Sequence, residues 1–305
     1  MSTVDVIIPT YKPGERLLRI LDFLEKQTIK PSKIILMNTE ESLFNDVAEK
    51  VKMYSNVEVH HVTRENFDHG KTRAEGVSFS NADFFLCLTD DAIPTDKQLI
   101  EKLLMCFEDS EVVVAYGRQL PGRKSSITEK YTRKYNYPEF SCKKTEKDIE
   151  KMGIKAFFCS NACAMYRRST YNELGGFIDK TIFNEDMIFA HAVLLNQKAI
   201  YYQAEATVIH SHKYDLKQQF KRNFDLGVSH AMYPEIFLGM KSESEGMRMV
   251  KKVSLELLND GNGIFIPYFF LQCAAKLLGY KTGRNYKKLS KKRIHSCTMN
   301  QNFWL

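Results

Sequence analysis

Two adjacent carboxylates, Asp90 and Asp91, follow an apolar run of strand length, Phe84 to Leu88, after the single residue Thr89. The composition of this run predicts a buried strand, so the carboxylates lie at its carboxyl end, where open α/β sheets bind their ligands. Oxygen ligands at that position suit a hard divalent cation. Two acidic residues that only solvate a strand-to-helix turn would have the same pattern, and neighbouring residues must separate the two interpretations.

Two histidines offer further metal ligands. His210 and His212 lie two residues apart after the predicted strand Thr207 to Ile209, so an extended backbone points both side chains the same way. A pair of imidazoles beside an acidic strand end would complete a metal shell. A single histidine in such a place is more commonly structural.

A second acidic pair, Glu185 and Asp186, opens a predicted helix. Carboxylates in a first turn complement the helix dipole, so both residues have an ordinary structural explanation. One of them would serve equally well as a general base if it faced the ligand crevice. The spacing alone favours neither interpretation.

Two loops have residues that suit a nucleotide. The first predicted strand ends in Pro9-Thr10-Tyr11, where Tyr11 would stack on a nucleobase. The run from His69 to Arg73 enters a helix, where its backbone amides and two cationic side chains would face an anion. An ordinary solvated helix start would have the same sequence pattern. The sequence contains neither G-x-G-x-x-G nor a P-loop, so a dinucleotide fold and a P-loop enzyme are unsupported.

Alternating strands and helices position these residues. Helical spacing from Leu17 to Leu24 and from Val47 to Tyr54 separates strands, which predicts βαβ units and an α/β fold with a parallel sheet. The ligand crevice should then collect the loops after Pro9, Met37, Val62 and Leu88. The predicted strands are Val4 to Pro9, Lys33 to Met37, Val57 to Val62, Phe84 to Leu88 and Val112 to Tyr116.

The rest of the chain divides in two. Residues 118–155 are polar and have no regular period, Ala156 to Tyr166 has an extended pattern, and Ala199 to Tyr202 and Thr207 to Ile209 are predicted as two strands. After His212 the pattern turns helical. We therefore expect a nucleotide-binding and catalytic domain at residues 1–213 and a helical, basic region at 214–305.

Composition limits the class of protein. The chain has 305 residues, 44% hydrophobic and 27% charged, with a net charge of +7, as in a globular protein. Residues 261–305 contain eight Lys or Arg and no acidic residue, so the basic character belongs to this tail. The start, MSTVDVIIPTY, has no signal-peptide pattern, which predicts a cytoplasmic protein.

The tail suggests a surface that it binds. Its apolar segment Ile264 to Leu278 is shorter than the roughly 20 residues of a spanning helix, so it should lie on a membrane or pack in a core. The basic run Lys281 to Arg293 suits a nucleic acid or an anionic membrane. Because the sequence contains no nucleic-acid module, we expect a peripheral membrane association and no nucleic acid partner.

Together these motifs resemble glycosyltransferase family 2, which has the GT-A fold, a Rossmann-like mixed sheet flanked by helices. The motifs are V-I-I-P-T-Y, N-x-x-H-G-x-T-R, T-D-D-A-x-P, S-N-A-C-A-M-Y-R-R, L-G-G-F, N-E-D-M-x-F-A and I-H-S-H. They are most similar to the bacterial polysaccharide rhamnosyltransferase branch. The resemblance spans residue 4 to about residue 230, and the ordered set is far more specific than any single motif.

The resemblance implies a role for each matching residue. Asp186 would deprotonate the acceptor hydroxyl with support from Glu185, and Arg73 would lie near the donor diphosphate. Asp91 would bind Mg²⁺ or Mn²⁺ with Asp90 beside it. His212, or else His210, would complete the metal site. The implied nucleotide pocket consists of Pro9, Thr10, Tyr11 and Glu40.

The sequence departs from the family pattern at two points. Thr89 stands where many members have the first Asp of D-x-D, which puts the metal affinity in question. The second strand is followed by N-T-E-E-S in place of the common D-D-G-S, so the selectivity for the base is open.

The resemblance implies an inverting transfer of L-rhamnose from dTDP-L-rhamnose to a glycan or lipid-linked glycan, at the inner face of the plasma membrane. One alternative is transfer of a hexose or aminosugar from a UDP donor. Another is a non-catalytic module that binds a membrane or glycolipid. A nucleotidyltransferase is least supported, because an early phosphate loop rich in Gly and Lys is missing from the sequence.

Overall fold

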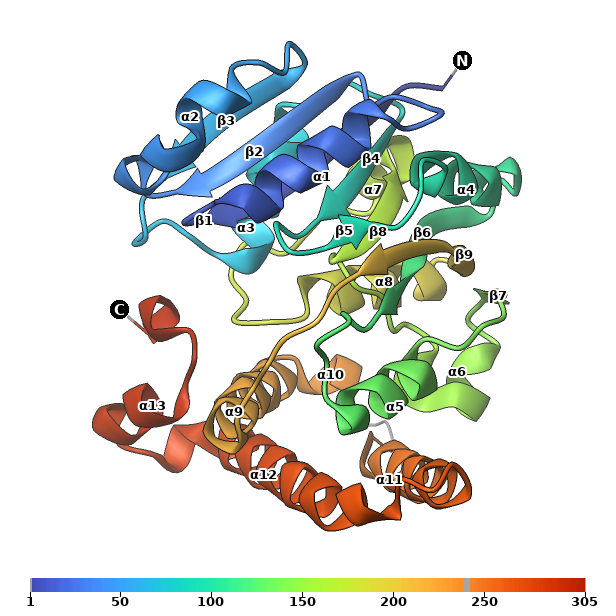
Figure 1. Ribbon diagram of the computed structural model, residues 1–305, viewed down its shortest axis with the longest axis vertical. Helices are drawn as coiled ribbons and strands as arrows, with labels where there is room; N and C mark the ends of the chain where they lie inside the picture. Colours follow the sequence, from blue (N-terminus) through green and yellow to red (C-terminus); the bar gives the residue numbers. More distant parts are fainter. Residues whose placement is uncertain (1, 238–241, 305) are drawn as a thin grey trace. The chain divides into compact units, whose positions relative to one another are not determined.

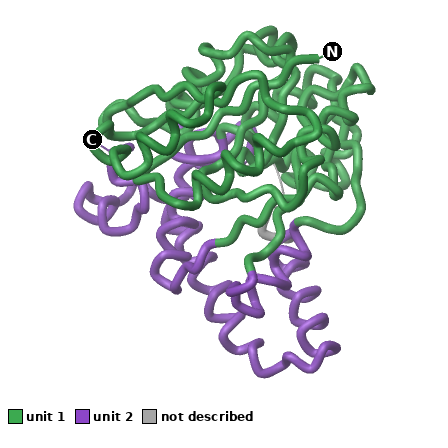
Figure 2. Tube along the Cα trace, turned by 45° about the horizontal axis from the view of Figure 1, so that its top comes forward, with its two compact units in different colours: residues 1–122, 137–180, 185–211 green, residues 123–136, 181–184, 212–305 purple. Residues whose placement is uncertain are grey.

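The structure, a computed structural model, describes residues 2–237 and 242–304, with side chains from residue 245 onward in the second range. The chain divides into two compact units (Figure 2). The first comprises residues 1–122, 137–180 and 185–211, and the second comprises 123–136, 181–184 and 212–305. The last stretch of the second unit thus begins at residue 212, where the sequence suggested a boundary near 213, and two earlier stretches join it.

The first unit starts as the predicted βαβ alternation (Figure 1). Its first four strands pair in the order β3-β2-β1-β4, and all three pairings are parallel. The chain order therefore reverses between β1 and β4, the position at which open α/β sheets bind ligands. These elements are β1 (Val4–Tyr11), α1 (Glu15–Glu25), β2 (Lys33–Thr39), α2 (Asn45–Val51), β3 (Val57–Val62), α3 (His69–Ser78) and β4 (Phe84–Leu88).

The sheet continues past β4 with mixed directions, in the order β8-β6-β9-β5, while β7 also pairs with β9. Only the β6–β9 pairing is parallel here. This confirms a mixed α/β fold with a largely parallel sheet. The strands are β5 (Ile93–Pro94), β6 (Val112–Leu120), β7 (Cys142–Lys144), β8 (Cys163–Arg167) and β9 (Ala199–Ile209), and the remaining helices of this unit are α4 (Leu99–Met105), α6 (Asp148–Met152), α7 (Arg168–Glu173) and α8 (Glu185–Leu195).

The structure corrects three predictions of local structure. Residues 118–155, which showed no period, contain the end of β6, two helices and β7. The extended stretch Ala156 to Tyr166 was too long, because β8 starts only at Cys163. The two strands expected within residues 199–209 form one strand, β9, whose register against β6 is interrupted between Gly117 and Arg118.

The core of the first unit explains why these segments form the sheet. All five residues of β4 are buried, and α1 buries Leu17, Leu21 and Leu24 in the same hydrophobic cluster as Leu86. Because β4 is covered on both faces, its sequence is a continuous apolar run without alternation. The first charged residue after this run, Asp90, therefore follows immediately where the strand leaves the core.

Helices form the second unit, as the sequence predicted for the C-terminal extension. Close packing joins α9 to α12: a Cβ atom added to Gly279 would lie 2.1 Å from the carbonyl oxygen of Phe220, and one added to Gly283 would lie 2.0 Å from that of Phe224. Only glycine permits this approach of two backbones. The helices are α5 (Ile127–Asn136), α9 (Leu216–Met232), α10 (Pro234–Phe237), α11 (Ser242–Asn259), α12 (Ile266–Arg284) and α13 (Lys291–Cys297).

Short 3-10 helices complete the chain and belong to both units. They are η1 (Glu41–Leu43), η2 (Cys106–Glu108), η3 (Gly153–Lys155), η4 (Gly263–Phe265), η5 (Tyr286–Lys288) and η6 (Gln301–Trp304).

Candidate active site

One edge of the sheet in the first unit collects most of the predicted site residues. Tyr11 ends β1, and Asp90 follows β4 at the adjacent parallel strand end. Strand β8 runs antiparallel to β4 and begins with Cys163 opposite Leu88, so the residues just before β8 reach the same edge. The ends of β6 and β9 pair through Leu120 and Ile209, so His210 lies at this edge too.

Tyr11 lies in a polar cluster that suits a nucleoside. Its ring is about half exposed, with the Arg64 guanidinium 5.3 Å from the ring centroid. Arg64 Nη2 donates a hydrogen bond to Tyr11 Oη (2.7 Å), and the Arg64 backbone N–H donates to Glu40 Oε1 (2.6 Å). The predicted residues Tyr11 and Glu40 are therefore joined by Arg64, which the sequence reading missed.

The neighbouring strand ends form the floor of this cluster. Thr10 Oγ1 donates to Asn38 Oδ1 (3.1 Å), and Asn38 Nδ2 lies 3.0 Å from His61 Nδ1. Both Thr10 and Asn38 are buried, and Pro9 pairs with Met37 in the β1–β2 ladder. Asn38 occupies the first position of the loop sequence that departs from the family pattern, so a neutral amide stands where many members have a carboxylate.

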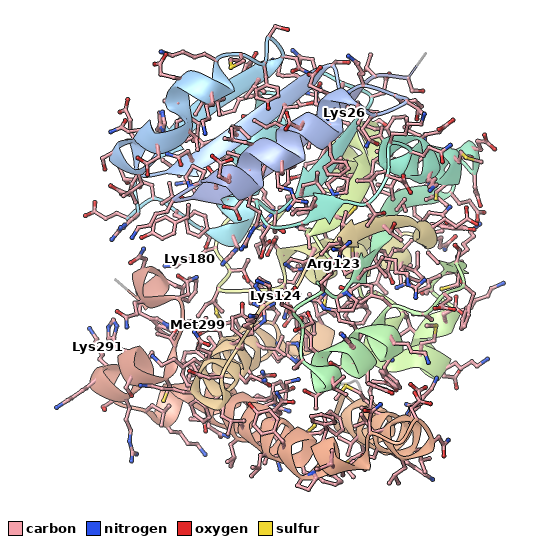
Figure 3. All side chains as sticks on the ribbon, in the orientation of Figure 1. Lys26, Arg123, Lys124, Lys180, Lys291 and Met299 are labelled. Carbon is pink, nitrogen blue, oxygen red and sulfur yellow. The ribbon has the colours of Figure 1, made fainter. Side chains whose placement is uncertain are left out.

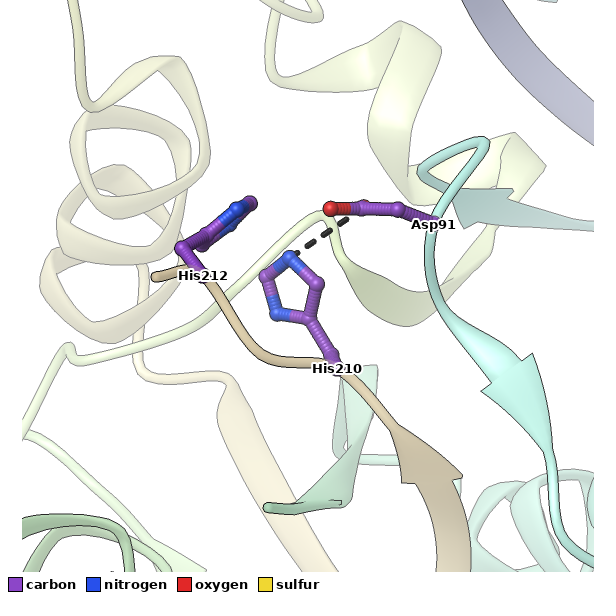
Figure 4. A group of neighbouring side chains, drawn as sticks. All are labelled: Asp91, His210 and His212. Carbon is purple, nitrogen blue, oxygen red and sulfur yellow. Dashed lines mark ion pairs between the residues drawn. The ribbon is translucent and has the colours of Figure 1, made fainter. Parts of the chain in front are cut away.

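Asp91, His210 and His212 offer metal ligands together (Figure 4). One ligand atom of each lies within 4.8 Å of the others, and Asp91 Oδ1 is 3.2 Å from His210 Nε2. His212 follows His210 by two residues and is the first residue of the second unit's last stretch. The structure thus groups both histidines with Asp91, and their binding of a metal stays a prediction.

The hydrogen bonds of His210 test whether this group fits a cation. Gln119 Nε2 donates to Ser160 Oγ (2.8 Å), which turns Gln119 Oε1 toward His210 Nδ1 (2.8 Å) as an acceptor. With a proton only on Nδ1, the His210 ring would present the lone pair of Nε2 toward the Asp91 carboxylate. Two electron-pair donors at 3.2 Å need a cation or a proton between them. Carboxylate and imidazole ligands with an oriented imidazole fit a divalent metal.

Asp90 has a different environment from Asp91. Its Oδ2 accepts a hydrogen bond from the Tyr11 backbone N–H (3.4 Å), which ties the end of β4 to the end of β1. Burial, followed by the charge of Asp91, raises the pKa of Asp90 to about 6. A positive ion nearby would favour the charged form of Asp90.

The second acidic pair forms a buried cluster at the start of α8. Glu185 Oε1 lies 3.0 Å from Arg73 Nη1 of α3, and Asn161 Nδ2 donates to the same Glu185 oxygen (3.0 Å). The Asn161 backbone N–H donates to Asp186 Oδ2 (2.9 Å). The three residues Arg73, Glu185 and Asn161 are almost fully buried. Asn161 thus contacts both carboxylates from the loop before β8.

The two adjacent carboxyl groups have opposite pKa shifts. Burial, followed by the negative charge of Glu185, raises the pKa of Asp186 to about 7. Burial also acts on Glu185, but the charges of Arg73 and His69 and the hydrogen bond from Asn161 hold its pKa below the usual value. Paired carboxyl groups whose environments separate their pKa values are typical of acid–base sites. Asp186 is therefore the member suited to accept a proton near neutral pH.

Arg73 was expected beside a donor diphosphate. In the structure its guanidinium is buried against Glu185, and its Nη1 also donates to the His69 carbonyl (2.9 Å). Its observed partner is thus the acidic pair. A role of Glu185 and Asp186 as helix-dipole complements alone does not account for the ion pair of Glu185 with Arg73 or for the hydrogen bond that Asp186 accepts from Asn161.

Asn161 was missed as a site residue, although it lies in the S-N-A motif. Tyr166 Oη donates to Asn161 Oδ1 (2.7 Å), and the Tyr166 ring stacks on Phe85 of β4 with centroids 5.1 Å apart. The motif S-N-A-C-A-M-Y therefore joins the polar cluster to the core of the sheet. Its only sequence signal is a polar pair directly before a buried strand.

Comparison with known proteins identifies the family of this chain and two relatives that are similar over nearly its whole length. Residues 5–175 match the family model described as Glycosyl transferase family 2. The chain is 35% identical over 305 residues to O-antigen chain rhamnosyltransferase RfbN of Salmonella typhimurium, covering 99% of this chain and 96% of that protein. It is also 35% identical over 309 residues to O-antigen chain rhamnosyltransferase WbaN of Salmonella anatum, covering 100% and 96%.

Solved structures share the fold at lower identity. The mannosyltransferase PcManGT from Pyrobaculum calidifontis, in complex with GDP-Man and Mn²⁺, superposes with a TM-score of 0.55 at 13% identity, over 99% of this chain and 85% of that one. S. aureus TarS 1–349 in complex with UDP-GlcNAc superposes with a TM-score of 0.54 at 15% identity, over 94% and 92%. At these identities the likeness concerns the fold.

Proposed function

We propose a specific reaction for this chain, which belongs to glycosyl transferase family 2 and is a glycosyltransferase. In this proposal it transfers L-rhamnose from dTDP-L-rhamnose, with inversion, to a glycan or lipid-linked glycan of a bacterial cell-surface polysaccharide. The choice of rhamnose is supported by the two relatives named O-antigen chain rhamnosyltransferases, which match at 35% identity over nearly their whole length. The inverting reaction is supported by one observation above all. The carboxyl group of the partly buried Asp186 has its pKa raised to about 7, and it lies beside the Glu185 carboxyl group, whose pKa is held below its usual value.

In the proposed step, Asp186 takes the proton of an acceptor hydroxyl. The hydroxyl oxygen attacks the anomeric carbon of the donor from the face opposite the nucleoside diphosphate. The new bond forms as the bond to the diphosphate oxygen breaks, and that oxygen leaves with the electron pair. A single displacement of this kind inverts the anomeric configuration, and a base with a pKa near the working pH is the most effective one.

Glu185 and Arg73 have a supporting role in this step. Arg73 keeps Glu185 ionised at a distance of 3.0 Å, and the charge of Glu185 in turn raises the proton affinity of Asp186. The hydrogen bond from the Asn161 N–H orients Asp186 Oδ2. A direct contact of Arg73 with the donor diphosphate stays a prediction.

Asp91, His210 and His212 would hold Mg²⁺ or Mn²⁺, with His210 Nε2 as a ligand atom when His210 Nδ1 donates to Gln119. When bound, the ion supplies positive charge that stabilises the departing diphosphate. Asp90 connects this group to the nucleoside end of the site through the Tyr11 N–H. Binding of Mn²⁺ with GDP-Man in a mannosyltransferase of the same fold is consistent with this assignment.

The donor nucleoside would lie against Tyr11 and Arg64. A half-exposed tyrosine ring with a guanidinium 5.3 Å from its centroid provides a stacking surface for a base. Glu40 fixes the Arg64 backbone, while Thr10 and Asn38 close the floor. Because Asn38 is buried and neutral, we expect it to shape the floor under the base without adding a charge.

We also propose a cytoplasmic location at the inner membrane face, with a lipid-linked acceptor. The support is the apolar segment of the second unit followed by basic residues without acidic neighbours. Such paired weak anchors add in membrane binding.

A donor screen tests the proposed function. Purified protein would be incubated with membrane-extracted acceptor and with dTDP-L-rhamnose, UDP-glucose, UDP-GlcNAc or GDP-mannose, with Mg²⁺, with Mn²⁺ or with chelator. We expect nucleoside diphosphate release and a labelled product only with dTDP-L-rhamnose and a divalent metal. Turnover restricted to a UDP or GDP sugar would instead assign another donor.

A further inference from the structure

Helix α12 has two unlike faces. One face is buried within the second unit and includes Phe269, Gln272, Gly279 and Gly283. The glycines bring the backbone of α12 against α9, where added Cβ atoms would lie 2.1 Å and 2.0 Å from carbonyl oxygens. This face is fully engaged by its own unit.

The opposite face is apolar and exposed. Its large side chains recur at helical spacing and keep between 44% and 84% of their surface accessible. Between Ile264 and Tyr280 the sequence has one charged residue, Lys276, whose pKa is lowered by burial on the other side of the helix. The exposed apolar residues are Ile264 of the adjoining η4 and Tyr268, Phe270, Leu271, Leu277 and Leu278 of α12. We call this set the α12 apolar face.

Basic side chains follow the α12 apolar face directly. Lys281 and Arg284 are exposed in the last turns of α12, and the chain then continues through η5 into α13. Figure 3 labels Lys291 on α13, where the residue is exposed. The exposed basic residues of this region, which we call the basic segment, are Lys281, Arg284, Lys287, Lys288, Lys291, Lys292 and Arg293.

The charge of this region selects among possible occupants. Residues 261–305 contain no Asp or Glu, so the basic segment has no acidic neighbour within the tail. A second copy of the chain would bring the same positive charges against each other. An anionic lipid surface matches both features, because its headgroups attract Lys and Arg and its acyl region accepts apolar side chains.

The packing of α12 decides how it would meet a bilayer. The helix Gly263–Arg284 is 22 residues long with a mean hydropathy of 1.2 and is 17% buried, so by length and composition it would also span a membrane. Spanning would separate Gly279 and Gly283 from α9 and would move Gln272 and Lys276 into hydrocarbon, which is costly. A helix held along one side by its own unit can expose only its other side to lipid.

We propose that the α12 apolar face lies in the interfacial layer of an anionic bilayer, parallel to its plane, with the basic segment on the lipid headgroups. This inference rests on the proposed function and adds to it the surface by which the enzyme would reach a lipid-linked acceptor. The binding itself requires no donor and is measured separately from transfer. Lipid binding therefore succeeds or fails independently of the assignment of dTDP-L-rhamnose.

The test is flotation of the full chain with vesicles of phosphatidylcholine alone or with about 30% phosphatidylglycerol. The variant Leu271→Glu/Leu278→Glu places two charges on the α12 apolar face. Met53→Glu/Phe140→Glu is the matched control, because both residues are largely exposed in the first unit and the change in charge is the same. Circular dichroism confirms folding, and sedimentation equilibrium gives the oligomeric state.

We expect the wild type and the control to float with anionic vesicles, and the α12 variant to partition at least about 100-fold more weakly, since two apolar side chains lose their burial. A second variant, Lys287→Glu/Lys288→Glu, should reduce the preference for phosphatidylglycerol over phosphatidylcholine. Equal flotation of the wild type and the α12 variant would overturn the proposal. A wild type that does not float, or a dimer that Leu271→Glu/Leu278→Glu dissociates, would overturn it as well.

Discussion

Asp186 and Glu185 are adjacent in the sequence, but of the two only Glu185 forms an ion pair with a cationic side chain in the part of the chain that the structure describes. Arg73 contacts Glu185 at 3.0 Å, whereas Asp186 accepts hydrogen bonds from the backbone N–H groups of Asn161 and Met187. Glu185 is buried and Asp186 partly buried, so the absence of a cationic partner among the described residues leaves Asp186 with the higher proton affinity. This difference in environment assigns the base to Asp186.

The pH dependence of transfer should report this base. Burial and the neighbouring charge of Glu185 raise the pKa of Asp186 to about 7, and the base works in its ionised form. We therefore expect kcat/KM to fall about tenfold per pH unit as the pH drops below about 7, and to level off above it. Initial rates at subsaturating acceptor from pH 5.5 to pH 8.5 measure the profile. A profile flat down to about pH 5 would contradict the assignment.

Asn161 should act as a positioning residue. Asn161→Ala removes the side-chain bonds to Glu185 and Tyr166 and loosens the loop whose N–H donates to Asp186. Because that N–H lowers the pKa of Asp186, the acidic limb should move to higher pH, with kcat reduced by about 10- to 100-fold. Asn196→Ala is the control, since Asn196 bonds only locally at the end of α8, to the Ala192 carbonyl.

A lower melting temperature for Asn161→Ala with an unchanged pH profile would indicate a structural role only. The profile and the donor KM are therefore measured on the same samples as the thermal unfolding.

Sequence reasoning at this scale singled out Asp90, Asp91, His210 and His212 because they follow predicted strands. It singled out Glu185 and Asp186 because they open a predicted helix. It missed Asn161, Gln119 and Arg64, which act through partners far away in the sequence. Gln119 lies inside the stretch 118–155 that showed no period. Such residues become visible only when strand pairing brings β6, β8 and β9 together.

At the scale of elements, the glycine contacts between α9 and α12 fix the second unit. A Cβ at Gly283 would lie 2.0 Å from the Phe224 carbonyl oxygen, and a backbone atom cannot move aside cheaply. Gly283→Ala should therefore reduce the free energy of unfolding by about 1–3 kcal/mol. Gly246 on α11 meets nothing within 4 Å, so Gly246→Ala should stabilise by up to about 1 kcal/mol. Denaturant unfolding of both variants checks the opposite signs, and equal effects would contradict this packing.

Local patterns predicted the elements well where one rule applied. The βαβ alternation and the buried run of β4 were correct, because β1, β2 and β4 each contain a buried apolar run. The prediction divided β9 into two strands because polar residues such as Glu205 interrupt its apolar pattern. In the structure, the register of β9 against β6 jumps at this point from Gln203 to Thr207. Strand β7 has only three residues, two of them lysines, and its pairing with β9 has no sequence signal.

At the scale of the whole molecule, donor binding should depend on a metal. Asp91 supplies the carboxylate of the group with His210 and His212, so Asp91→Asn should abolish the Mg²⁺- or Mn²⁺-dependent part of donor affinity. Isothermal titration with dTDP-L-rhamnose, with and without metal, measures this part. Asp96→Asn is the control. Asp96 follows Asp91 by a few residues, after β5, and pairs with Lys102 of α4 at 2.8 Å. Equal metal dependence in Asp91→Asn and wild type would exclude the assigned site.

The central claim is that Asp186 is the base of an inverting rhamnosyl transfer, and the Asp186→Asn variant tests it most directly. The variant keeps the size of the side chain and its hydrogen bond from the Asn161 N–H but cannot accept the hydroxyl proton. The measurement is the transfer rate at saturating dTDP-L-rhamnose, with donor affinity determined on the same sample. We predict a loss of at least about 100-fold in rate with donor affinity within about threefold of wild type. Transfer at the wild-type rate would contradict the claim.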